Sequence, residues 1–388
     1  MKFPAFFHMV LCILILYNRK TSMWNPLQLL LPKRFLGIDI GTSNIKIVEV
    51  SKFGNRRKLE NYGSLPSAVL YKKPFRTFEK SSLLLSSNDI SRAISAIMEE
   101  ANIKTRQAIF SIPDFSTFFT SIELPPMTKE ELPQAVRYEA RQHIPLPLGE
   151  VTLDWQVIEG EASDQKKTNL KILLVAVPNE VINQYREIAR IAQLELVALE
   201  AEVFGLISSL IGEDEKGIVG LIDIGAQSTT CSVVDKRILK ISHSFDMSGS
   251  EFARVASQGL NVDYEAAEKL KVKYGIAGLS NGEAGSAKEI REILLPLVDV
   301  ILKEIERIFN NFSVKTGKEI EKIILAGGTA LLPGLKEYIY ENFKKEVEIA
   351  NPFSASGIFY TPILEETLKK MGPSYAIAIG MALHGLEY

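Results

Sequence analysis

Two stretches of the chain share one pattern of apolar and polar positions. Residues 35–50 and 219–234 each contain an apolar run, then Asp-Ile-Gly with small polar residues, then a second apolar run. Apolar runs bounded by such residues predict strands, so each stretch predicts a β-hairpin with its turn at Gly41 or Gly225. A turn glycine can adopt a positive φ and let backbone amides approach a ligand closely. The repeated hairpin predicts two similar lobes.

A third glycine-rich turn follows later in the chain. An apolar strand at residues 323–325 leads into Gly327 and Gly328, and Pro333 is expected in the opening turn of the next helix. Glycines at a strand end let a flat ring lie on the backbone without interference from a Cβ atom. A Gly-Gly pair alone more often marks a plain turn. Its position after the two hairpins favours a ligand-binding role instead.

Between the hairpins, the pattern predicts a compact unit of strands and helices. Thr128, with Glu131 three residues later, has the capping-box signature, so a helix is expected from Thr128 to Ile144, where Pro145 ends it. Strands are expected at residues 151–158 and 170–177, and a second helix at residues 179–192.

Composition narrows the class of protein. A chain of 388 residues is long enough for two domains, and its net charge of -2 leaves no basic excess to hold a nucleic-acid backbone. Cys12 and Cys231 lie far apart and form no disulfide framework, and the four histidines have no ligand spacing. We therefore expect a protein of the reducing cytoplasm that binds neither nucleic acid nor a transition metal.

The N-terminus stands apart from the rest. Residues 3–17 are almost continuously apolar and precede Arg19 and Lys20, but about 15 residues fall short of the roughly 20 that span a bilayer. Three interpretations remain open: a short anchor, a docking helix, or a non-native leader upstream of a natural start at Met23.

The two hairpins carry the candidate chemistry. Loops of backbone N–H groups and hydroxyls bind anions, and a carboxylate at a strand end holds a hydrated divalent cation. Facing each other, the hairpins would hold a polyphosphate with magnesium between them. Either hairpin alone is more often an ordinary buried strand pair than a phosphate-binding site. The presence of both favours the phosphate-binding interpretation.

These motifs carry a resemblance to a known superfamily. Asp39-Ile-Gly-Thr, Asp223-Ile-Gly-Ala and Ala326-Gly-Gly-Thr resemble the phosphate-1, phosphate-2 and adenosine motifs of the actin, Hsp70 and sugar-kinase superfamily. Residues 199–206 and 375–383 look like its two connecting helices, whose small residues allow a close crossing. The resemblance implies an α/β, actin-like (ribonuclease H-like, duplicated) two-lobed fold.

The segment 124–147 resembles the PilM family of type IV pilus assembly proteins, as does Asn351-Pro-Phe. That resemblance implies an inserted subdomain of the type found in FtsA and PilM. The implied divisions are a leader at 1–34, a first lobe (1A) at 35–116 and 179–212, the inserted subdomain (1C) at 117–178, a second lobe (2A) at 213–246 and 292–388, and a small helical subdomain (2B) at 247–291.

The family resemblance also implies ATP and Mg²⁺ as cofactors, with site residues at matching positions. Asp39 and Asp223 would organise the metal, and Glu202 would polarise the attacking water, with Glu200 as an alternative. Glu268 and Lys271 would reach the ribose or base, although a solvated ion pair is an equal interpretation. The nucleotide-binding set comprises Asp39, Gly41, Thr42, Ser43, Asn44, Lys46, Asp223, Gly225, Ala226, Gln227, Ser228, Glu268, Lys271, Gly327, Gly328 and Thr329.

Asn44 and Gln227 are bulky for phosphate loops, which argues against rapid hydrolysis; at most a slow ATPase is expected.

The implied partner is the cytoplasmic N-terminal peptide of a PilN-type inner-membrane protein, held near the helix at 132–144 and the strand at 151–157. The pilus motor ATPase is a second candidate. The implied location is cytoplasmic, at the inner face of the inner membrane, with indirect membrane contact. The alternatives are an FtsA-like filament-forming division protein and a superfamily phosphotransferase.

Overall fold

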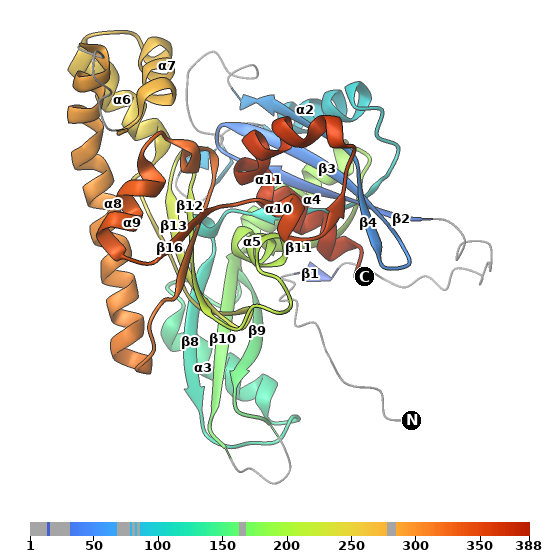
Figure 1. Ribbon diagram of the computed structural model, residues 1–388. Helices are drawn as coiled ribbons and strands as arrows, with labels where there is room; N and C mark the ends of the chain where they lie inside the picture. Colours follow the sequence, from blue (N-terminus) through green and yellow to red (C-terminus); the bar gives the residue numbers. More distant parts are fainter. Residues whose placement is uncertain are drawn as a thin grey trace.

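The computed structural model describes residues 14–15, 32–67, 78–79, 82–83, 86–162, 168–277 and 285–388. Figure 1 shows two sheets with the helices α5 and α11 between them, a small three-stranded unit below, and the helices α6, α7 and α8 at the side of the second sheet. The apolar runs of the sequence form the strands, and three clusters of buried side chains form the cores.

The first sheet has seven strands in the order β1-β11-β7-β2-β3-β4-β17. β2 is antiparallel to β3 and parallel to β7, and β3 is antiparallel to β4. The strands span Leu14–Ile15 (β1), Lys33–Ile40 (β2), Asn44–Phe53 (β3), Arg56–Pro66 (β4), Gln107–Ile112 (β7), Glu195–Ala201 (β11) and Ile358–Phe359 (β17).

Helices cover both faces of this sheet. A Cβ atom on Gly37 of β2 would strike the backbone of α11, and one on Gly63 of β4 would strike Ile97 of α2. Because Gly37 and Gly63 lie on opposite faces in the strand register, the two helices lie on opposite faces. These and the neighbouring helices span Ser87–Glu100 (α2), Asn179–Ile191 (α4), Glu202–Leu210 (α5), Pro352–Ala355 (α10) and Glu365–Gly385 (α11).

The second sheet repeats the arrangement of the first. Its order, β14-β13-β12-β15-β16, corresponds strand for strand to β4-β3-β2-β7-β11, with the same parallel and antiparallel pairings. The predicted duplicated, actin-like fold is confirmed. The elements are Ile218–Ile224 (β12), Thr229–Asp235 (β13), Ile238–Phe245 (β14), Ser286–Thr316 (α8), Lys322–Ala326 (β15), Leu335–Phe343 (α9) and Glu346–Ile349 (β16).

Two smaller units complete the fold. A sheet of order β8-β10-β9 packs on α3 around its own apolar cluster, and α6 and α7 pack against α8. The elements are Phe118–Leu124 (β8), Leu132–His143 (α3), Val151–Glu159 (β9), Leu170–Pro178 (β10), Gly249–Leu260 (α6) and Tyr264–Tyr274 (α7), with a short hairpin at Phe78–Glu79 (β5) and Ser82–Leu83 (β6) and 3-10 turns at Asp114–Ser116, Gly328–Leu331 and Pro362–Leu364.

The capping box forms, but the helix begins later than predicted. The Thr128 N–H donates to Glu131 Oε2 at 2.9 Å, and the Glu131 N–H donates to Thr128 Oγ1 at 3.3 Å. Pro133 has no N–H to bond back to Lys129, so the regular helix starts only at Leu132. The strands predicted at 151–158 and 170–177 and the helix predicted at 179–192 are confirmed to within one residue.

Two other boundaries were wrong. Residues 199–201, predicted as helix, are the end of β11, because they pair with β7 in the middle of the sheet. The connecting helix α5 begins at Glu202. Pro333 precedes α9 instead of lying in its first turn, because Gly334 takes a left-handed conformation with φ 82° at the N-cap. Helix α11 contains the predicted second connecting helix at 375–383.

The three interpretations of residues 3–17 lie outside the described residues, apart from Leu14–Ile15, which pair with the edge of β11. Within the described part of the chain, no helix combines the length and the apolarity needed to cross a membrane. The proposed subdomain boundaries stay predictions.

Candidate functional site: a cleft between two glycine hairpins

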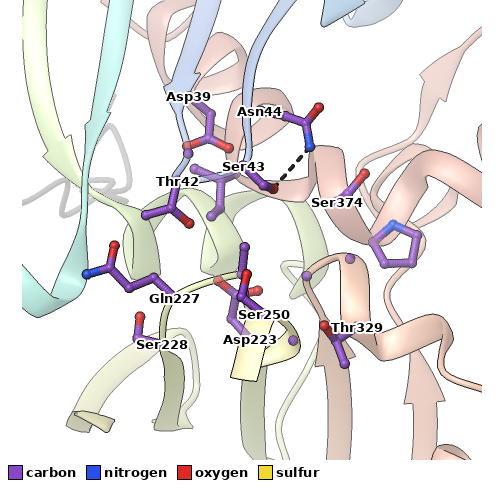
Figure 2. A pocket seen from close by; sticks show the side chains of 18 of the residues that line it. Asp39, Thr42, Ser43, Asn44, Asp223, Gln227, Ser228, Ser250, Thr329 and Ser374 are labelled. Carbon is purple, nitrogen blue, oxygen red and sulfur yellow. Dashed lines mark hydrogen bonds between the residues drawn. The ribbon is translucent and has the colours of Figure 1, made fainter. Parts of the chain in front are cut away.

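A cleft of about 580 Å³ opens between the two sheets, where β2 and β12 end. Every residue predicted as nucleotide-binding, metal-binding or catalytic lines it: Asp39, Gly41, Thr42, Ser43, Asn44, Lys46, Glu202, Asp223, Gly225, Ala226, Gln227, Ser228, Glu268, Lys271, Gly327, Gly328 and Thr329. The fold thus brings together segments that are far apart in the sequence. Figure 2 shows Asp39, Thr42 and Ser43 on one side and Asp223, Gln227 and Ser228 on the other.

The two hairpin turns have the same geometry. The Gly41 N–H donates to the Asn44 carbonyl at 3.1 Å, and the Gly225 N–H donates to the Ser228 carbonyl at 3.0 Å. Neither glycine has a positive φ, so the expected left-handed turn is not used. Glycine is needed for space instead: a Cβ on Gly41 would lie 2.9 Å from the Asn44 oxygen, and one on Gly225 would lie 3.1 Å from the Ser228 oxygen.

Asp39 is held in place by its own lobe. Its Oδ1 accepts a hydrogen bond from Ser111 Oγ at 2.9 Å, and its Oδ2 accepts one from Lys46 Nζ at 3.0 Å. Burial lowers the pKa of Lys46, but the Asp39 carboxylate outweighs this effect and the pKa is raised. Both Asp39 oxygens are therefore engaged, and Lys46 is a fixed positive charge at the cleft.

Asp223 occupies the equivalent position in the second lobe, but its pKa and its neighbours differ from what the first lobe provides. Burial raises its pKa to about 6; the Lys46 ammonium opposes this and the Asp39 carboxylate adds to it. Asp223 has no lysine at the position equivalent to Lys46, because Thr230 stands opposite it on β13. Asp223 is therefore the carboxylate better placed to accept a cation.

The third glycine turn closes the cleft on the side of the second lobe. Gly327 has φ 83°, and its N–H donates to the Pro373 carbonyl of α11 at 3.0 Å. A Cβ on Gly327 would strike Asp223 Oδ1 and the Ile224 carbonyl, whereas one on Gly328 would meet nothing within 4 Å. Gly327 is thus required by the fold, and Gly328 leaves open space in the cleft.

Glu202 reaches the cleft from the first residue of α5. Its Oε2 accepts a hydrogen bond from the Asp114 N–H, and Asp114 Oδ1 accepts one from the Val203 N–H, both at 3.2 Å. Burial and the neighbouring Asp114 raise the pKa of Glu202 well above its usual range, and burial raises that of Asp114 to about 8. Burial therefore favours the protonated form of both acids.

Glu200, the alternative, does not line the cleft. It is fully buried on β11 and forms a hydrogen bond with His384 Nδ1 of α11. The change from strand to helix explains the difference, because Glu200 is still in β11 whereas Glu202 is the first residue of α5.

Glu268 and Lys271 form an ion pair with 2.7 Å between Glu268 Oε2 and Lys271 Nζ. The Lys271 ammonium is buried and donates to the Gly249 carbonyl at 2.9 Å, which ties α7 to the start of α6. The pair is therefore not simply solvated on a helix surface.

Several cleft residues were missed by the sequence analysis. Ser250 lies at the start of α6, where its N–H donates to the Ala226 carbonyl of the second hairpin at 3.2 Å. The Ser-Gly-Ser run before that helix was an available signal, because small polar residues mark helix starts. Tyr264 and Ser374 lie within helical patterns and gave no such signal. The missed residues include Ser64, Phe115, Thr230, Gly249, Ser250, Tyr264, Leu332, Ser374 and Tyr375.

A sequence profile described as "Type IV pilus assembly protein PilM" matches residues 37–386. The chain belongs to this family. A solved "PilM-PilN type IV pilus biogenesis complex" is 26% identical, covers 91% of this chain and 98% of that chain, and superposes with a TM-score of 0.79.

More distant similarities agree with the fold. The cell division protein FtsA of Enterococcus hirae is 23% identical over 355 residues, which are 82% of this chain and 78% of that protein. The structure of MreB 5 of Spiroplasma citri bound to AMPPNP is 14% identical, covers 87% of this chain and 97% of that one, and superposes with a TM-score of 0.51. These place the PilM-family chain among the actin-like ATPases in fold.

Proposed function

We propose that this chain is a cytoplasmic, ATP-binding scaffold of type IV pilus assembly, or of a related type II secretion system, at the inner face of the inner membrane. In this proposal it binds the cytoplasmic N-terminal peptide of a PilN-type inner-membrane protein, with the pilus motor ATPase as a second partner. The observation that carries the proposal is the meeting of both hairpin turns and the third glycine turn in one cleft.

The side chains of the cleft fit a magnesium nucleotide. Gln227 Oε1 is buried there and has no hydrogen-bond partner in the part of the chain that is described. Thr42, Ser43 and Ser228 supply hydroxyl groups, and Gly328 leaves space for a flat base. Among the described residues, no three His, Cys, Asp or Glu side chains form a metal site, which suits Mg²⁺ bound mainly by phosphate and water.

Bound magnesium would neutralise phosphate charge, and the residues of this chain would do the rest. Asp223 would hold the hydrated cation, with Asp39 beside it, and Lys46 would add a fixed positive charge. Glu202 is the candidate base for water, but burial and the neighbouring Asp114 raise its pKa, which favours its protonated form. A protonated acid cannot accept a proton, so hydrolysis would be slow and binding would dominate.

The inserted unit is the proposed site for the peptide. In the order β8-β10-β9, β9 is an edge strand, and most of its residues are partly buried. An extended peptide gains main-chain hydrogen bonds at such an edge, and side-chain pockets provide specificity. The structure of a PilM–PilN complex supports this partner, and α3 and β9 are the elements we propose to lie near the peptide.

One contact links the inserted unit directly to the second lobe. Lys240 Nζ of β14 donates to Glu159 Oε1 at the end of β9, at 3.0 Å. If ATP closes the cleft, β14 moves with the second lobe and carries Lys240 relative to β9. We propose that this contact couples nucleotide state to peptide binding, as a shift between two populated conformations.

The test is the binding of a fluorescent PilN-type N-terminal peptide to the full chain, with and without magnesium ATP. Saturable peptide binding that changes with nucleotide would support both halves of the proposal. Tyr340→Ser, at an exposed position on α9, serves as a control variant outside the inserted unit. If substitutions of charged or apolar residues in β9 abolish peptide binding and the control variant does not, the peptide site lies at β9. If the ATP-loaded protein binds no peptide, the proposed scaffold function is wrong.

The similarity to FtsA supports one alternative, a filament-forming division protein. Sedimentation of the chain with ATP distinguishes the two. Filaments in the pellet would favour the division protein, and a protein that stays in solution while binding peptide would favour the scaffold. Phosphorylation of a small molecule in a substrate screen would instead indicate a phosphotransferase.

A further inference from the structure

A row of basic and aromatic side chains lies at the end of the first sheet farthest from the cleft. β3 turns into β4 between Phe53 and Arg56, and in the register Phe53 stands opposite Arg56. Lys58 pairs with Ser51 on β3 and with Phe359 on β17, and Ser51 pairs with Arg34 on β2. Paired residues, and residues two apart, share one face of a sheet. The hairpin-end surface therefore consists of Arg34, Phe53, Arg56, Lys58 and Phe359.

This surface is not covered by the helix that packs on the same face. Gly63 lies on that face nearer the cleft, where α2 covers it through Ile97. Toward the hairpin end, Phe53 is 60% exposed and Phe359 is 66% exposed. Two phenylalanine rings thus face solvent at one end of the first lobe (Figure 1, the end of β3 and β4 near the C-terminus).

The charge around these rings is positive. Residues 52–58 contain four basic and no acidic residues, in a chain whose net charge is -2. Two acidic residues lie beside this surface: Arg34 forms ion pairs with Glu49 and Glu60, both at 3.8 Å, and Lys58 forms one with Glu60 at 2.8 Å. Within the described residues, Arg56 forms no ion pair.

We propose that the hairpin-end surface docks on the anionic headgroups of a phospholipid membrane. Basic residues are attracted to anionic lipid, and aromatic rings gain free energy at the boundary between headgroups and acyl chains. Two exposed phenylalanine rings within a basic hairpin favour a bilayer over an acidic peptide as the occupant, because the rings can enter the boundary between headgroups and acyl chains.

Docking in this orientation leaves the cleft accessible. The hairpin-end surface and the Gly41 turn are at opposite ends of β2 and β3, and an eight-residue strand such as β2 separates them by roughly 25 Å. The contact with the membrane would therefore be direct, beyond the indirect contact made through a membrane-protein partner.

The test is sedimentation of the full chain with phosphatidylcholine vesicles that contain or lack phosphatidylglycerol. We expect binding to the anionic vesicles, weakened more than about tenfold by R56E/K58E and also weakened by F53S/F359S. The matched control is V314S/K315E at the end of α8, where Val314 is 86% exposed and Lys315 is exposed. That variant should bind as the parent does, and thermal unfolding should show that all variants are folded.

Three outcomes would overturn the proposal. The first is no sedimentation with anionic vesicles, and the second is equal binding to vesicles without phosphatidylglycerol. The third is vesicle binding that the hairpin variants and the control variant leave equally unchanged, which would assign membrane contact to another part of the chain. Poly-glutamate bound in place of vesicles, and lost in R56E/K58E, would assign the surface to an acidic protein.

Discussion

At the residue scale, two aspartates in equivalent positions differ because their neighbours differ. Asp39 has Lys46 and Ser111 as hydrogen-bond donors, whereas Asp223 faces Thr230 and has its pKa raised to about 6. The duplicated backbone thus carries one neutralised carboxylate and one that can be neutralised by an added cation.

Asp223→Asn is expected to abolish the magnesium dependence of nucleotide binding and to stabilise the nucleotide-free protein. A carboxylate with a raised pKa binds more protons in the folded state than in the unfolded state, so stability falls as pH rises from about 4 to about 6. The variant lacks this loss. Thermal unfolding at pH 4.5 and 7.5 measures this difference: the stability that the variant gains over the parent should be larger at pH 7.5 than at pH 4.5. Equal effects at both pH values would contradict the assignment.

Gly328→Val is expected to block nucleotide binding without unfolding the protein. A Cβ at Gly328 meets no atom within 4 Å, so the side chain projects into the open cleft. Fluorescent-nucleotide binding should fall more than about tenfold, equivalent to about 1.4 kcal/mol. Gly212→Val is the matched control, because a Cβ there also meets nothing within 4 Å but lies outside the cleft. Nucleotide binding unchanged in Gly328→Val would place the base elsewhere.

At the element scale, two helices cross at glycine. A Cβ on Gly380 of α11 would lie 1.9 Å from the Gly205 oxygen of α5, so the helices touch through their backbones. The small residues predicted in these two helices do allow a close crossing, and a hinge at this point stays a prediction.

Gly380→Ala is expected to destabilise the fold by about 3 kcal/mol, because the helices must move apart. The control is Gly372→Ala in the same helix, where the nearest atom to the added Cβ is 3.3 Å away. Urea unfolding of both variants measures the difference. Similar midpoints for the two would mean that α11 shifts without loss.

The buried Glu200–His384 pair joins β11 to the last turn of α11. Burial lowers the pKa of His384, but Glu200 outweighs it and, with Glu387, raises the pKa; Arg237 opposes them. His384→Ala would leave the Glu200 charge buried and cost about 3–5 kcal/mol. A raised histidine pKa stabilises the fold below pH 6.5, and the effect is lost as pH rises through the folded pKa. Urea unfolding from pH 6 to 9 should show this decline in the parent and not in the variant.

At the scale of the whole molecule, the inserted unit touches both lobes. It is continuous with the first lobe through β8 and β10, and it contacts the second through Glu159 and Lys240. A surface ion pair is worth about 0.2–1 kcal/mol, which is enough for a several-fold change in affinity. The geometry therefore suits a modest, adjustable coupling between cleft and inserted unit.

Lys240→Ala is expected to reduce the effect of ATP on peptide affinity to less than about twofold while leaving each ligand bound. Lys171→Ala is the matched control. Lys171 Nζ also forms an ion pair with Glu159 Oε1, at 3.8 Å, but Lys171 belongs to β10 of the same unit. Peptide titrations with and without magnesium ATP give the coupling. Loss of coupling in both variants, or in neither, would refute a role for the contact with β14.

How far the sequence could predict the structure depended on the range of the interactions. The hairpins, the capping box and the strands at 151–158 and 170–177 follow from neighbours within a few residues, and they appear in the structure. Residues 199–201 were misplaced because their apolar pattern fits a helix as well as it fits a strand. Pairing with β7, almost ninety positions away in the register, decides for the strand.

By itself, the sequence determined the duplicated hairpins, the family and the set of residues that gather in the cleft, because each depends on local motifs repeated along the chain. Only the tertiary structure decided that Glu202 and not Glu200 reaches the cleft, that the Asp114 N–H donates to Glu202, and that Gly41 and Gly225 are needed for space. Burial and charge proximity arise only when distant segments meet, so no local pattern encodes them.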